Sequence, residues 1–482
     1  MPADRLIRQT PPPAPGIVHL GPGAFFRAFN AAYTAEAMEA EGGFWGIRAV
    51  SLRSAGPRDQ LVPQGCAFTA VELGPNGSRR RVVEAVTECL VAPEDPERVL
   101  DAMADPATRI VSLTITEKGY CHDPASERLN PDHPDIRHDL ARPGRPRSAP
   151  GYMVEALARR KAAGLDPFTL LSCDNLPSNG PLTRGVVLDL ARLRDEGLAA
   201  WIAREGRFPA TMVDRITPAT TEEDVAALER EAGYRDEAMV AHEPFRQWVI
   251  EDRFVGGARP AWDRAGAQMV RSVERHELMK LRCLNGTHST LAYLGYLAGH
   301  ETVAEAVAAP GFATLLRRLW EEEIVPTVPP PEGEDLARYT EALLGRYRNG
   351  AIRHRLWQIA MDGSQKLPQR ILGTVRDNLD RDRVPVGLAL AVAAWMRYVG
   401  GTDERGQPID VRDPLAPRLR ALSDGAGTLE GKVAALLGLR EVFDPRLAGH
   451  GGFRDAVTRA YAALVREGAA ARVRAFAGEP AR

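Results

Sequence analysis

The sequence is poor in cysteine and has no excess of either charge. Five of its 482 residues are cysteine, and no two of them form a Cys-x-x-Cys pair. Because disulfide frameworks and structural zinc sites need closely spaced, paired cysteines, we expect reduced and mostly buried thiols instead. Lys and Arg total 62 while Asp and Glu total 64, which leaves a formal net charge of -2. This balance excludes the global basic field that marks many nucleic-acid-binding proteins.

Long apolar runs and metal-binding motifs are missing as well. No uninterrupted apolar stretch reaches the roughly 18 residues that a membrane-spanning helix needs. The N-terminal region is rich in proline between residues 11 and 15 and lacks the apolar middle of a secretory signal. None of the ten histidines falls in a His-Glu-x-x-His arrangement, and no convincing Cys and His set for a catalytic zinc is present. We therefore expect a soluble, cytoplasmic protein that binds no membrane, nucleic acid or metal.

The first part of the chain, residues 16–272, alternates apolar runs of strand length with helical patterns. The runs that predict strands are 17–20, 45–52, 109–115 and 168–172, and those that predict helices are 24–41, 152–163 and 183–204. Near-continuous apolar strands that alternate with helices indicate a parallel sheet covered on both faces. The fold class expected here is α/β, with a doubly covered parallel sheet.

The second part, residues 273–482, shows helical spacing of apolar residues and no further strand pattern. Helices are expected over 277–297, 312–322, 336–346, 352–361, 386–398 and 456–467, with a stiff connector at 326–331 and a loop at 400–417. At about 100–200 residues per domain, the length agrees with a division into domains. We expect an all-helical C-terminal domain.

Two glycines follow the first predicted strand directly and precede the first predicted helix. Gly21 can make the tight turn of a dinucleotide-binding loop, and Gly23 lets the backbone approach a pyrophosphate at the helix N-terminus. The third glycine of the usual G-x-G-x-x-G pattern is replaced by Phe26. An ordinary strand–turn–helix corner is the alternative interpretation. The position of the glycines between a predicted strand and a predicted helix favours dinucleotide binding.

The second predicted strand does not decide between NAD and NADP. Asp59 could bind the ribose hydroxyls of NAD, as an acidic residue near this position does in many dinucleotide-binding domains. Arg53 and Ser54 stand at the tip of the strand, where the 2′-phosphate of NADP would be held. Both cofactors stay open at this point.

The segment around Lys280 places four polar residues on one predicted helix face. At about 100° per residue from Lys280, Glu277 lies at about 60°, His288 at about 80° and Asn285 at about 140°. A solvated helix face is the alternative, but the segment is apolar around much of its girth. A lysine, an amide, an imidazole and a carboxylate in one wedge therefore indicate a polar site.

Two further polar clusters each follow a predicted strand. Residues 172–180 read Ser-Cys-Asp-Asn-Leu-Pro-Ser-Asn-Gly after one strand, and residues 114–120 read Thr-Ile-Thr-Glu-Lys-Gly-Tyr after another. Plain turn chemistry would explain either cluster. Ligands of doubly wound sheets bind beyond the carboxyl ends of the strands, so both are also candidates for a site.

Together these stretches resemble the long-chain, metal-independent polyol dehydrogenases of the mannitol dehydrogenase family. The resemblance covers roughly residues 16–470 and rests on the glycine loop at 21–28, on 172–175, on 211–216, and on Lys280 with Asn285 and His288. Residues 112–121, 243–252 and 357–368 are most similar to the fructuronate reductase (D-mannonate oxidoreductase) branch. Two places depart from the family pattern: Phe29 stands where members commonly have His, and residues 346–350 read Arg-Tyr-Arg-Asn-Gly where many read Arg-Phe-Ser-Asn-Pro.

The resemblance implies an oxidoreductase that interconverts D-mannonate and D-fructuronate by hydride transfer with a nicotinamide cofactor. NAD is expected, with NADP open, and the glycine-loop residues implied in cofactor binding are Gly21, Gly23, Ala24, Phe25 and Arg27. An uncharged polyol as substrate and a catalytically inactive NAD-binding sensor are the alternatives. Apart from a small sugar acid or polyol, no partner is expected, and the protein would be a monomer or a weak homo-oligomer.

The resemblance also implies a role for each domain: a Rossmann-like dinucleotide-binding domain over residues 16–272 and a helical substrate-binding domain over residues 273–482. It further implies roles in catalysis. Lys280 would be the general base, Asn175 and Asn285 would donate hydrogen bonds to the developing alkoxide, and His288 and Asp214 would hold substrate hydroxyls. Glu277 would relay protons from Lys280 to solvent. A substrate carboxylate needs a cation, and the candidates in order are Arg346, then Arg353, His354 and Lys366.

Overall fold

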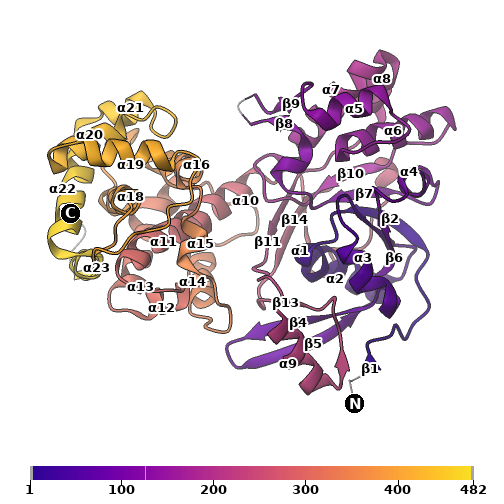
Figure 1. Cartoon of the computed structure of the whole chain (residues 1–482), viewed down its shortest axis with the longest axis horizontal. Helices are drawn as coiled ribbons and strands as arrows, with labels where there is room; N and C mark the ends of the chain where they lie inside the picture. The colour runs from indigo at the N-terminus through magenta and orange to yellow at the C-terminus, as the bar shows by residue number, and fades with distance from the viewer. Residues whose placement is uncertain (1–3, 125, 479–482) are drawn as a thin grey trace. The chain divides into compact units, whose positions relative to one another are not determined.

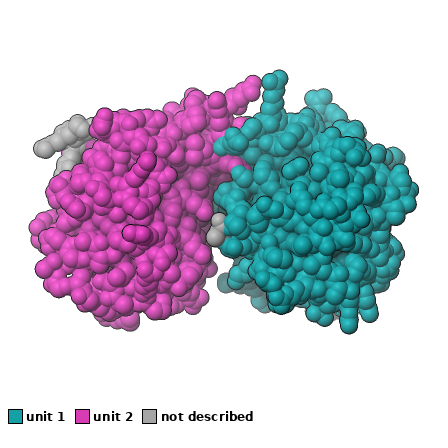
Figure 2. Space-filling view, turned by 90° about the horizontal axis from the view of Figure 1, so that it is seen from above, with its two compact units in different colours: residues 1–274 teal, residues 275–482 magenta. Residues whose placement is uncertain are grey.

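A computed structural model describes residues 4–124 and 126–478, and Figure 1 shows their helices and strands. The chain forms two compact units, residues 1–274 and residues 275–482, which Figure 2 colours separately. We call them the N-terminal unit and the C-terminal unit. None of the helices in the described residues is both long and apolar enough to cross a membrane.

The N-terminal unit is built on a five-stranded parallel sheet with the order β10-β7-β2-β3-β6. Its strands are β10 (Thr169–Ser172), β7 (Ile110–Leu113), β2 (Pro15–Leu20), β3 (Gly46–Ser51) and β6 (Val86–Val91). From β2 the chain proceeds to β3 and β6 on one side, and then to β7 and β10 on the other (Figure 1), so the strand order reverses between β2 and β7. The predicted Rossmann-type fold is confirmed.

Alternate residues of β2 face two separate cores. Val18 and Leu20 belong to a core that also contains side chains of α4 (Pro96–Ala104), α6 (Ala149–Ala162) and α7 (Asn179–Arg194). Ile17 belongs to a second core with side chains of the helical run α1 (Ala24–Phe26), η1 (Arg27–Ala31) and α2 (Ala32–Glu41). Because successive side chains of a strand point to opposite faces, helices cover both faces of the sheet.

Smaller sheets and helices complete the N-terminal unit. One three-stranded sheet has the order β11-β14-β15, another has the order β13-β4-β5, and β1 pairs with β12 and β8 with β9. The strands are β11 (Thr211–Asp214), β14 (Gln247–Glu251), β15 (Gln268–Val270), β13 (Val240–His242), β4 (Phe68–Gly74), β5 (Gly77–Val83), β1 (Asp4–Arg5), β12 (Tyr234–Arg235), β8 (His122–Asp123) and β9 (Arg128–Leu129). The helices are α3 (Gly56–Leu61), η2 (Val62–Gln64), η3 (Glu117–Tyr120), α5 (Pro134–Ala141), α9 (Glu222–Ala232) and η4 (Val255–Gly257).

The single helix expected over 183–204 is instead two helices, α7 and α8 (Glu196–Glu205). Asp195 lies between them with extended backbone angles, and its carboxylate accepts a hydrogen bond from the N–H of Leu198. An aspartate that caps a new helix in this way ends the preceding one, and apolar periodicity alone does not reveal it.

The described part of the C-terminal unit is helical apart from two isolated β-bridges, as predicted. Its elements are α10 (Glu274–Met279), η5 (Lys280–Gly286), α11 (Thr287–Leu297), α12 (Val303–Ala308), α13 (Phe312–Arg318), η6 (Leu319–Ile324), η7 (Val325–Thr327), α14 (Leu336–Tyr347), α15 (Leu356–Ala360), α16 (Gly363–Leu367), η8 (Pro368–Leu372), α17 (Gly373–Leu379), α18 (Val386–Val399), α19 (Ala416–Gly425), α20 (Leu429–Leu437), α21 (Pro445–Gly449), α22 (Gly451–Glu467) and α23 (Ala469–Gly478).

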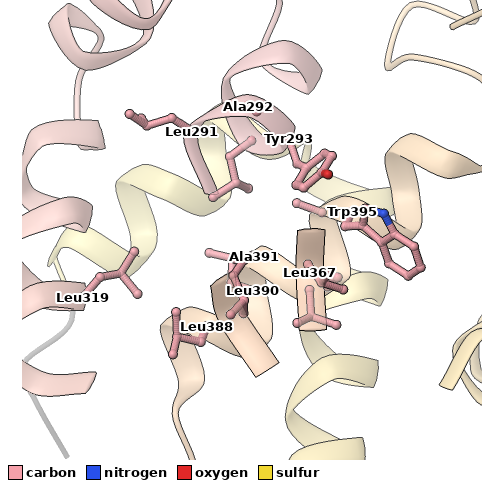
Figure 3. Close-up of a cluster of buried hydrophobic side chains, with 14 of the residues drawn as sticks. Leu291, Ala292, Tyr293, Leu319, Leu367, Leu388, Leu390, Ala391 and Trp395 are labelled. Atoms are coloured by element: carbon pink, nitrogen blue, oxygen red, sulfur yellow. The ribbon is translucent and has the colours of Figure 1, made fainter. Parts of the chain in front are cut away.

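Helix α18 forms the centre of this unit because it is apolar on nearly every side. Figure 3 shows Leu390 and Trp395 of α18 in one cluster with Leu291 and Tyr293 of α11. Helix α11 continues the segment that carries Lys280. The packing of α11 on α18 therefore anchors that segment in the core of the unit.

Candidate active site

The glycine loop runs from the end of β2 into α1. The φ angle of Gly21 is 94°, and a β-carbon there would collide with the carbonyl oxygen of Thr114, which follows β7. No atom lies within 4 Å of the position of a β-carbon on Gly23, which is the N-cap of α1 and has no side-chain cap. The loop therefore leaves free backbone N–H groups at the start of a long helical run, which is where a pyrophosphate binds in this fold.

A cavity of about 650 Å³ lies at the carboxyl ends of β2, β3 and β7. Residues that line it include Gly21, Gly23, Ser51, Arg53, Thr114 and Lys118. The cavity is at the reversal of strand order, where open α/β sheets bind their ligands. Its glycines, its position and its size fit a dinucleotide.

Phe26, which replaces the third glycine, packs on a buried histidine. The rings of Phe26 and His19 stack with centroids 3.8 Å apart. The two ring nitrogens of His19 lie within hydrogen-bond distance of hydroxyl groups: Nδ1 is 2.8 Å from Ser112 Oγ, and Nε2 is 2.9 Å from Thr114 Oγ1. Burial lowers the pKa of His19 to about 3, so the imidazole is neutral at pH 7. A ring stack thus joins helix and strand where the usual pattern has glycine.

The other glycine-loop residues implied in cofactor binding do not line the cavity. Arg27 is buried, and its Nη1 donates a hydrogen bond to the carbonyl oxygen of Pro22 at 2.9 Å. Phe25 is half-buried and stacks on Phe29 with ring centroids 4.9 Å apart. The departure at Phe29 therefore gives an aromatic pair, and Arg27 holds the loop backbone in shape.

The three residues that could bind the ribose hydroxyls or a 2′-phosphate are placed differently. Arg53 lines the cavity, whereas Asp59 does not and is bound by Arg58, whose Nη2 lies 2.8 Å from its carboxylate. Ser54 uses its carbonyl oxygen to accept a hydrogen bond from the Ser51 hydroxyl at 2.6 Å. Of the three residues, Arg53 is thus the one that faces the cavity.

The polar clusters after β7 and β10 are joined by Asp174. Its carboxylate accepts hydrogen bonds from the N–H groups of Ile115 at 3.1 Å and Thr116 at 2.8 Å, and from the Tyr120 hydroxyl at 2.7 Å. Asn175, the residue that follows, is exposed. Asp174 therefore fixes the backbone from which the Asn175 side chain projects.

A neighbouring amide ties β11 to the same loop. Asn179 Nδ2 donates to the carbonyl oxygens of Asp174 at 3.0 Å and Thr211 at 2.9 Å, and its Oδ1 accepts from the N–H of Thr211 at 3.0 Å. Strand β11 begins at Thr211 and ends at Asp214, whose side chain is buried. Asn175 and Asp214 are therefore both placed by one hydrogen-bonded framework in the N-terminal unit.

The Lys280 segment lies in the C-terminal unit and differs from the regular helix assumed in the sequence analysis. Residues 280–286 form a π-helix, η5, between α10 and α11. A π-helix closes its hydrogen bonds over five residues, so each residue turns by less than 100°. Asn285 therefore lies closer in angle to Lys280 than the predicted 140°, and the α-helical angles do not hold across this segment.

Side chains donate further hydrogen bonds to carbonyl oxygens near the end of the π-helix. The Cys283 carbonyl oxygen accepts from the Thr287 hydroxyl at 2.6 Å and from Trp320 Nε1 at 2.9 Å, and the Leu284 carbonyl oxygen accepts from the Tyr347 hydroxyl at 3.1 Å. Because buried carbonyl groups need partners, these contacts stabilise the π-helix. Lys280 and His288 are buried here with 7% and 6% of their surface exposed, and Glu277 and Asn285 are half-buried.

His288 lies in an aromatic and cationic environment. Its ring centroid is 4.8 Å from that of Tyr347 and 5.0 Å from that of His354. Burial lowers the pKa of His288 well below its ordinary value, and the nearby charges of Arg346 and other cations add to this effect. The imidazole is therefore neutral at pH 7 and can donate or accept a hydrogen bond.

The cations proposed for a substrate carboxylate are spread unevenly. Arg346 is half-buried, and its charge adds to the burial that lowers the pKa of His354. Arg353, by contrast, is 70% exposed and lies 3.5 Å from Glu301. The ammonium of Lys366 donates to the carbonyl oxygen of Met361 at 2.6 Å, and burial lowers its pKa to about 8. Arg353 is therefore the weakest candidate.

The structure adds Arg370, which the sequence analysis did not single out. It lies on η8 four residues after Lys366, and its charge acts on both His288 and His354. The i, i+4 spacing of two cations was the one signal in the sequence that could have drawn attention to it. In the described residues, no group of three or more His, Cys, Asp and Glu side chains is arranged to hold a metal ion.

Comparison with known proteins agrees with this geometry. Residues 15–264 match the mannitol dehydrogenase Rossmann domain and residues 272–465 the mannitol dehydrogenase C-terminal domain. D-mannonate oxidoreductase of Escherichia coli is 48% identical over 460 residues, covering 94% of each chain. The uncharacterized oxidoreductase YeiQ of the same organism is 47% identical over 455 residues, covering 94% of this chain and 93% of that one.

A solved relative extends the agreement to the whole fold. The structure of Pseudomonas fluorescens mannitol 2-dehydrogenase in a ternary complex with NAD and D-mannitol is 37% identical, with a TM-score of 0.85. The alignment covers 100% of this chain and 98% of that one. The protein is an oxidoreductase with a nicotinamide cofactor, and the chain belongs to the mannitol dehydrogenase family.

Proposed function

We propose that the protein interconverts D-mannonate and D-fructuronate by hydride transfer between the sugar acid and NAD. The observation that carries this proposal is the group of cations around His288 in the C-terminal unit, to which Arg346, Arg370 and Lys280 contribute. A carboxylate substrate would be attracted to such a group, whereas an uncharged polyol gains nothing from it. The 48% identity with D-mannonate oxidoreductase supports the same substrate.

Lys280 is proposed as the general base in the oxidative direction. It would take the proton of the substrate hydroxyl as the hydride leaves, and return it in the reductive direction. Asn175 and Asn285 would donate hydrogen bonds to the oxygen as it gains negative charge, which is the role a metal ion has in other alcohol dehydrogenases. Glu277, three residues before Lys280, would pass the proton on towards solvent.

Three further polar side chains would orient the substrate. The His288 imidazole has a ring nitrogen, Nε2, without a hydrogen-bond partner in the described chain, and can bind a hydroxyl. Asp214 would accept a hydrogen bond from another hydroxyl. Lys366 would lie beside the substrate as a further donor. Bound between such partners, the substrate carbon is held ready for hydride transfer.

The bound cofactor supplies the hydride acceptor, and the residues of the N-terminal cavity would hold it. Gly21, Gly23 and the N–H groups at the start of α1 would bind the pyrophosphate. We propose NAD because the relative of 37% identity was solved with NAD. Arg53 is the observation in favour of NADP, since it lines the cavity and could bind a 2′-phosphate. Dissociation constants for NADH and NADPH, measured by nicotinamide fluorescence, distinguish the two.

A second candidate function is the oxidation of an uncharged polyol. The relative solved with D-mannitol favours it, because the pattern of Lys280, Asn285 and His288 suits any secondary alcohol. An inactive NAD-binding sensor is less well supported, since cofactor binding alone does not require a buried lysine such as Lys280.

One assay tests these functions together. NAD(P)H absorbance at about 340 nm is followed with D-mannonate, D-mannitol and D-arabinitol in oxidation, and with D-fructuronate and D-fructose in reduction. Preferential turnover of the two sugar acids is expected. Higher kcat/KM for the polyols would replace the proposal by the second candidate, and no turnover of any compound would favour the sensor.

A further inference from the structure

Arg370 is held beside the Lys280 segment by a close approach of two backbones. A β-carbon on Gly286, at the end of η5, would lie 2.7 Å from the carbonyl oxygen of Arg370. Only a glycine lets η8 pack this closely on η5. The Nη1 atom of Arg370 lies 3.4 Å from the hydroxyl of Ser289, the residue after His288. The arginine is thus fixed next to the helix that carries the proposed catalytic side chains.

The charge of Arg370 has no carboxylate partner in the described part of the chain. Its side chain is half-buried, and the Ser289 hydroxyl is its one hydrogen-bond partner among the described residues. Arg282, on the same segment as Lys280, shows the usual arrangement: it lies 2.6 Å from the Asp377 carboxylate and also donates to a backbone carbonyl. Since an arginine has five N–H donors, most of those of Arg370 are available to a ligand.

The groups around Arg370 are neutral or positive. Nε2 of His288 and Nδ1 of His354 are buried without a hydrogen-bond partner in the described chain. Burial lowers the pKa of His354 to about 4, and the charges of Arg346 and Arg370 add to this, so the imidazole is neutral at pH 7. Such a region attracts an anion, and its ring nitrogens can bind hydroxyl groups.

The nearby carboxylates interact with residues other than Arg370. Asp413 and Asp362 influence Lys366, the next cation along the chain. The Asp413 carboxylate accepts hydrogen bonds from the N–H of Ser364 at 2.7 Å and from its hydroxyl at 2.6 Å. Burial lowers the pKa of the Arg370 guanidinium, and the side chains that oppose this shift are Tyr293 and Tyr347 rather than a carboxylate.

We propose that the guanidinium of Arg370 binds the carboxylate of the sugar-acid substrate and that the free ring nitrogens of His288 and His354 bind its hydroxyl groups. The planar fork of an arginine matches the two oxygens of a carboxylate, whereas the hydroxymethyl group of a polyol offers a single uncharged oxygen. Arg370 is then the residue that distinguishes acid from polyol. This inference rests on the proposed function, because it needs a sugar acid as the substrate.

The test compares Arg370→Gln with wild type on D-mannonate and D-mannitol, which differ only in the carboxylate. A lost charged hydrogen bond is expected to lower kcat/KM for D-mannonate by roughly 10- to 150-fold, with a loss below about 3-fold for D-mannitol. Arg370→Lys keeps the positive charge but loses the two-pronged guanidinium, so its kcat/KM for D-mannonate should lie between those of wild type and Arg370→Gln. The matched control is Arg376→Gln on α17, where the arginine is 49% exposed and lies 3.0 Å from Asp444.

The outcomes separate this inference from the proposed function. Wild-type preference for D-mannitol overturns both. Preference for D-mannonate in wild type, together with equal losses on both substrates or no loss in Arg370→Gln, overturns the role of Arg370 alone. A selective loss in Arg346→Gln and none in Arg370→Gln assigns the carboxylate to Arg346. NADH affinity and the thermal midpoint of unfolding show whether each variant is folded. If both are lost in Arg370→Gln, the test uses Arg370→Lys and compares its kcat/KM on D-mannonate with its kcat/KM on D-mannitol.

Discussion

The hydroxyl of Tyr120 donates a hydrogen bond to the carboxylate of Asp174 across 2.7 Å, and this contact joins the loops that follow β7 and β10. Tyr120 also lies 2.6 Å from the Ser172 hydroxyl, so the network reaches back into β10 itself. Burial raises the pKa of Asp174, and the hydrogen bonds from Tyr120 and from two backbone N–H groups oppose that rise. The residue before Asn175 therefore has a structural task that requires an acceptor at this position.

Asp174→Ala should destabilise the N-terminal unit and weaken cofactor binding. The change removes the acceptor of the part-buried N–H groups of Ile115 and Thr116 and of the buried Tyr120 hydroxyl, at a cost of about 0.5–1.5 kcal/mol for each hydrogen bond lost. Tyr120→Phe removes one hydrogen bond and should cost less, about 1 kcal/mol. Urea unfolding and NADH titration measure the two effects. The surface variant Asp132→Asn is the control, and Asp174→Ala with stability equal to that control would contradict the role of Asp174.

The sequence was sufficient for the parts of the fold that depend on local pattern. Strands β7 and β10 are buried along their whole length and read as continuous apolar runs, so their positions and the parallel sheet could be predicted. Gly21 could be predicted as well, because a turn that brings the backbone against Thr114 leaves no room for a β-carbon.

The parts that escaped prediction depend on partners distant in the sequence. The π-helix over 280–286 is stabilised by Trp320 and Tyr347, and nothing in the local spacing of Lys280 and Asn285 reports those contacts. The position of Arg370 follows from the packing of η8 on η5, which periodicity cannot reveal. The sequence thus supplied the residue types of the site, and the tertiary contacts decide how they are arranged.

The stability of the C-terminal unit should decrease as pH rises from 4.5 to 7 because of Glu323. Burial raises the pKa of this carboxyl to about 7, although the N–H groups of Gly387 and Leu388 donate to it at 2.7 and 2.8 Å and oppose the rise. A raised pKa in the folded state means that folding favours the protonated form. The contribution of Glu323 to the free energy of unfolding is therefore complete below pH 4.5 and is lost as pH rises to about 7. The free energy of unfolding decreases by about 3 kcal/mol over this range.

Glu323→Gln removes the ionisation and should remove this part of the pH dependence. Urea unfolding followed by tryptophan fluorescence between pH 4.5 and 7.5 measures the free energy of unfolding for both proteins. The exposed Glu321→Gln provides the matched control two residues away. Parallel curves for wild type and Glu323→Gln would contradict the assignment.

Catalysis is expected to be independent of metal ions. The sequence offers no zinc motif, and in the described residues no cluster of three or more His, Cys, Asp and Glu side chains could hold a metal. Asn175 and Asn285 are proposed to stabilise the alkoxide instead. Exhaustive dialysis against EDTA should leave kcat and KM unchanged, as measured by NADH absorbance. Loss of activity that added zinc restores would contradict the proposed mechanism.

Lys280→Ala should lower the oxidation rate by roughly 10²–10⁴-fold, the usual size of a general acid–base contribution, with NADH affinity nearly unchanged. A lysine accepts a proton only as the neutral amine, and free lysine titrates near 10.4. If Lys280 is the base, the oxidation rate of wild type rises with pH through one ionisation well below that value, and the reduction rate falls through it. Burial of the side chain and a positive nicotinamide ring are the general causes of such a displacement.

The pH profile of the variant tests whether that ionisation belongs to Lys280. It should be absent in Lys280→Ala, and a small external amine such as methylamine should restore part of the rate because it can take the proton in place of the side chain. Lys161→Ala, a surface lysine 3.9 Å from Asp195, controls for the loss of a positive charge. If Lys280→Ala keeps both the wild-type ionisation and most of the rate, another group is the base. The relay proposed for Glu277 would then fail as well, because it passes on the proton that Lys280 accepts, and the catalytic role of the whole segment would have to be assigned anew.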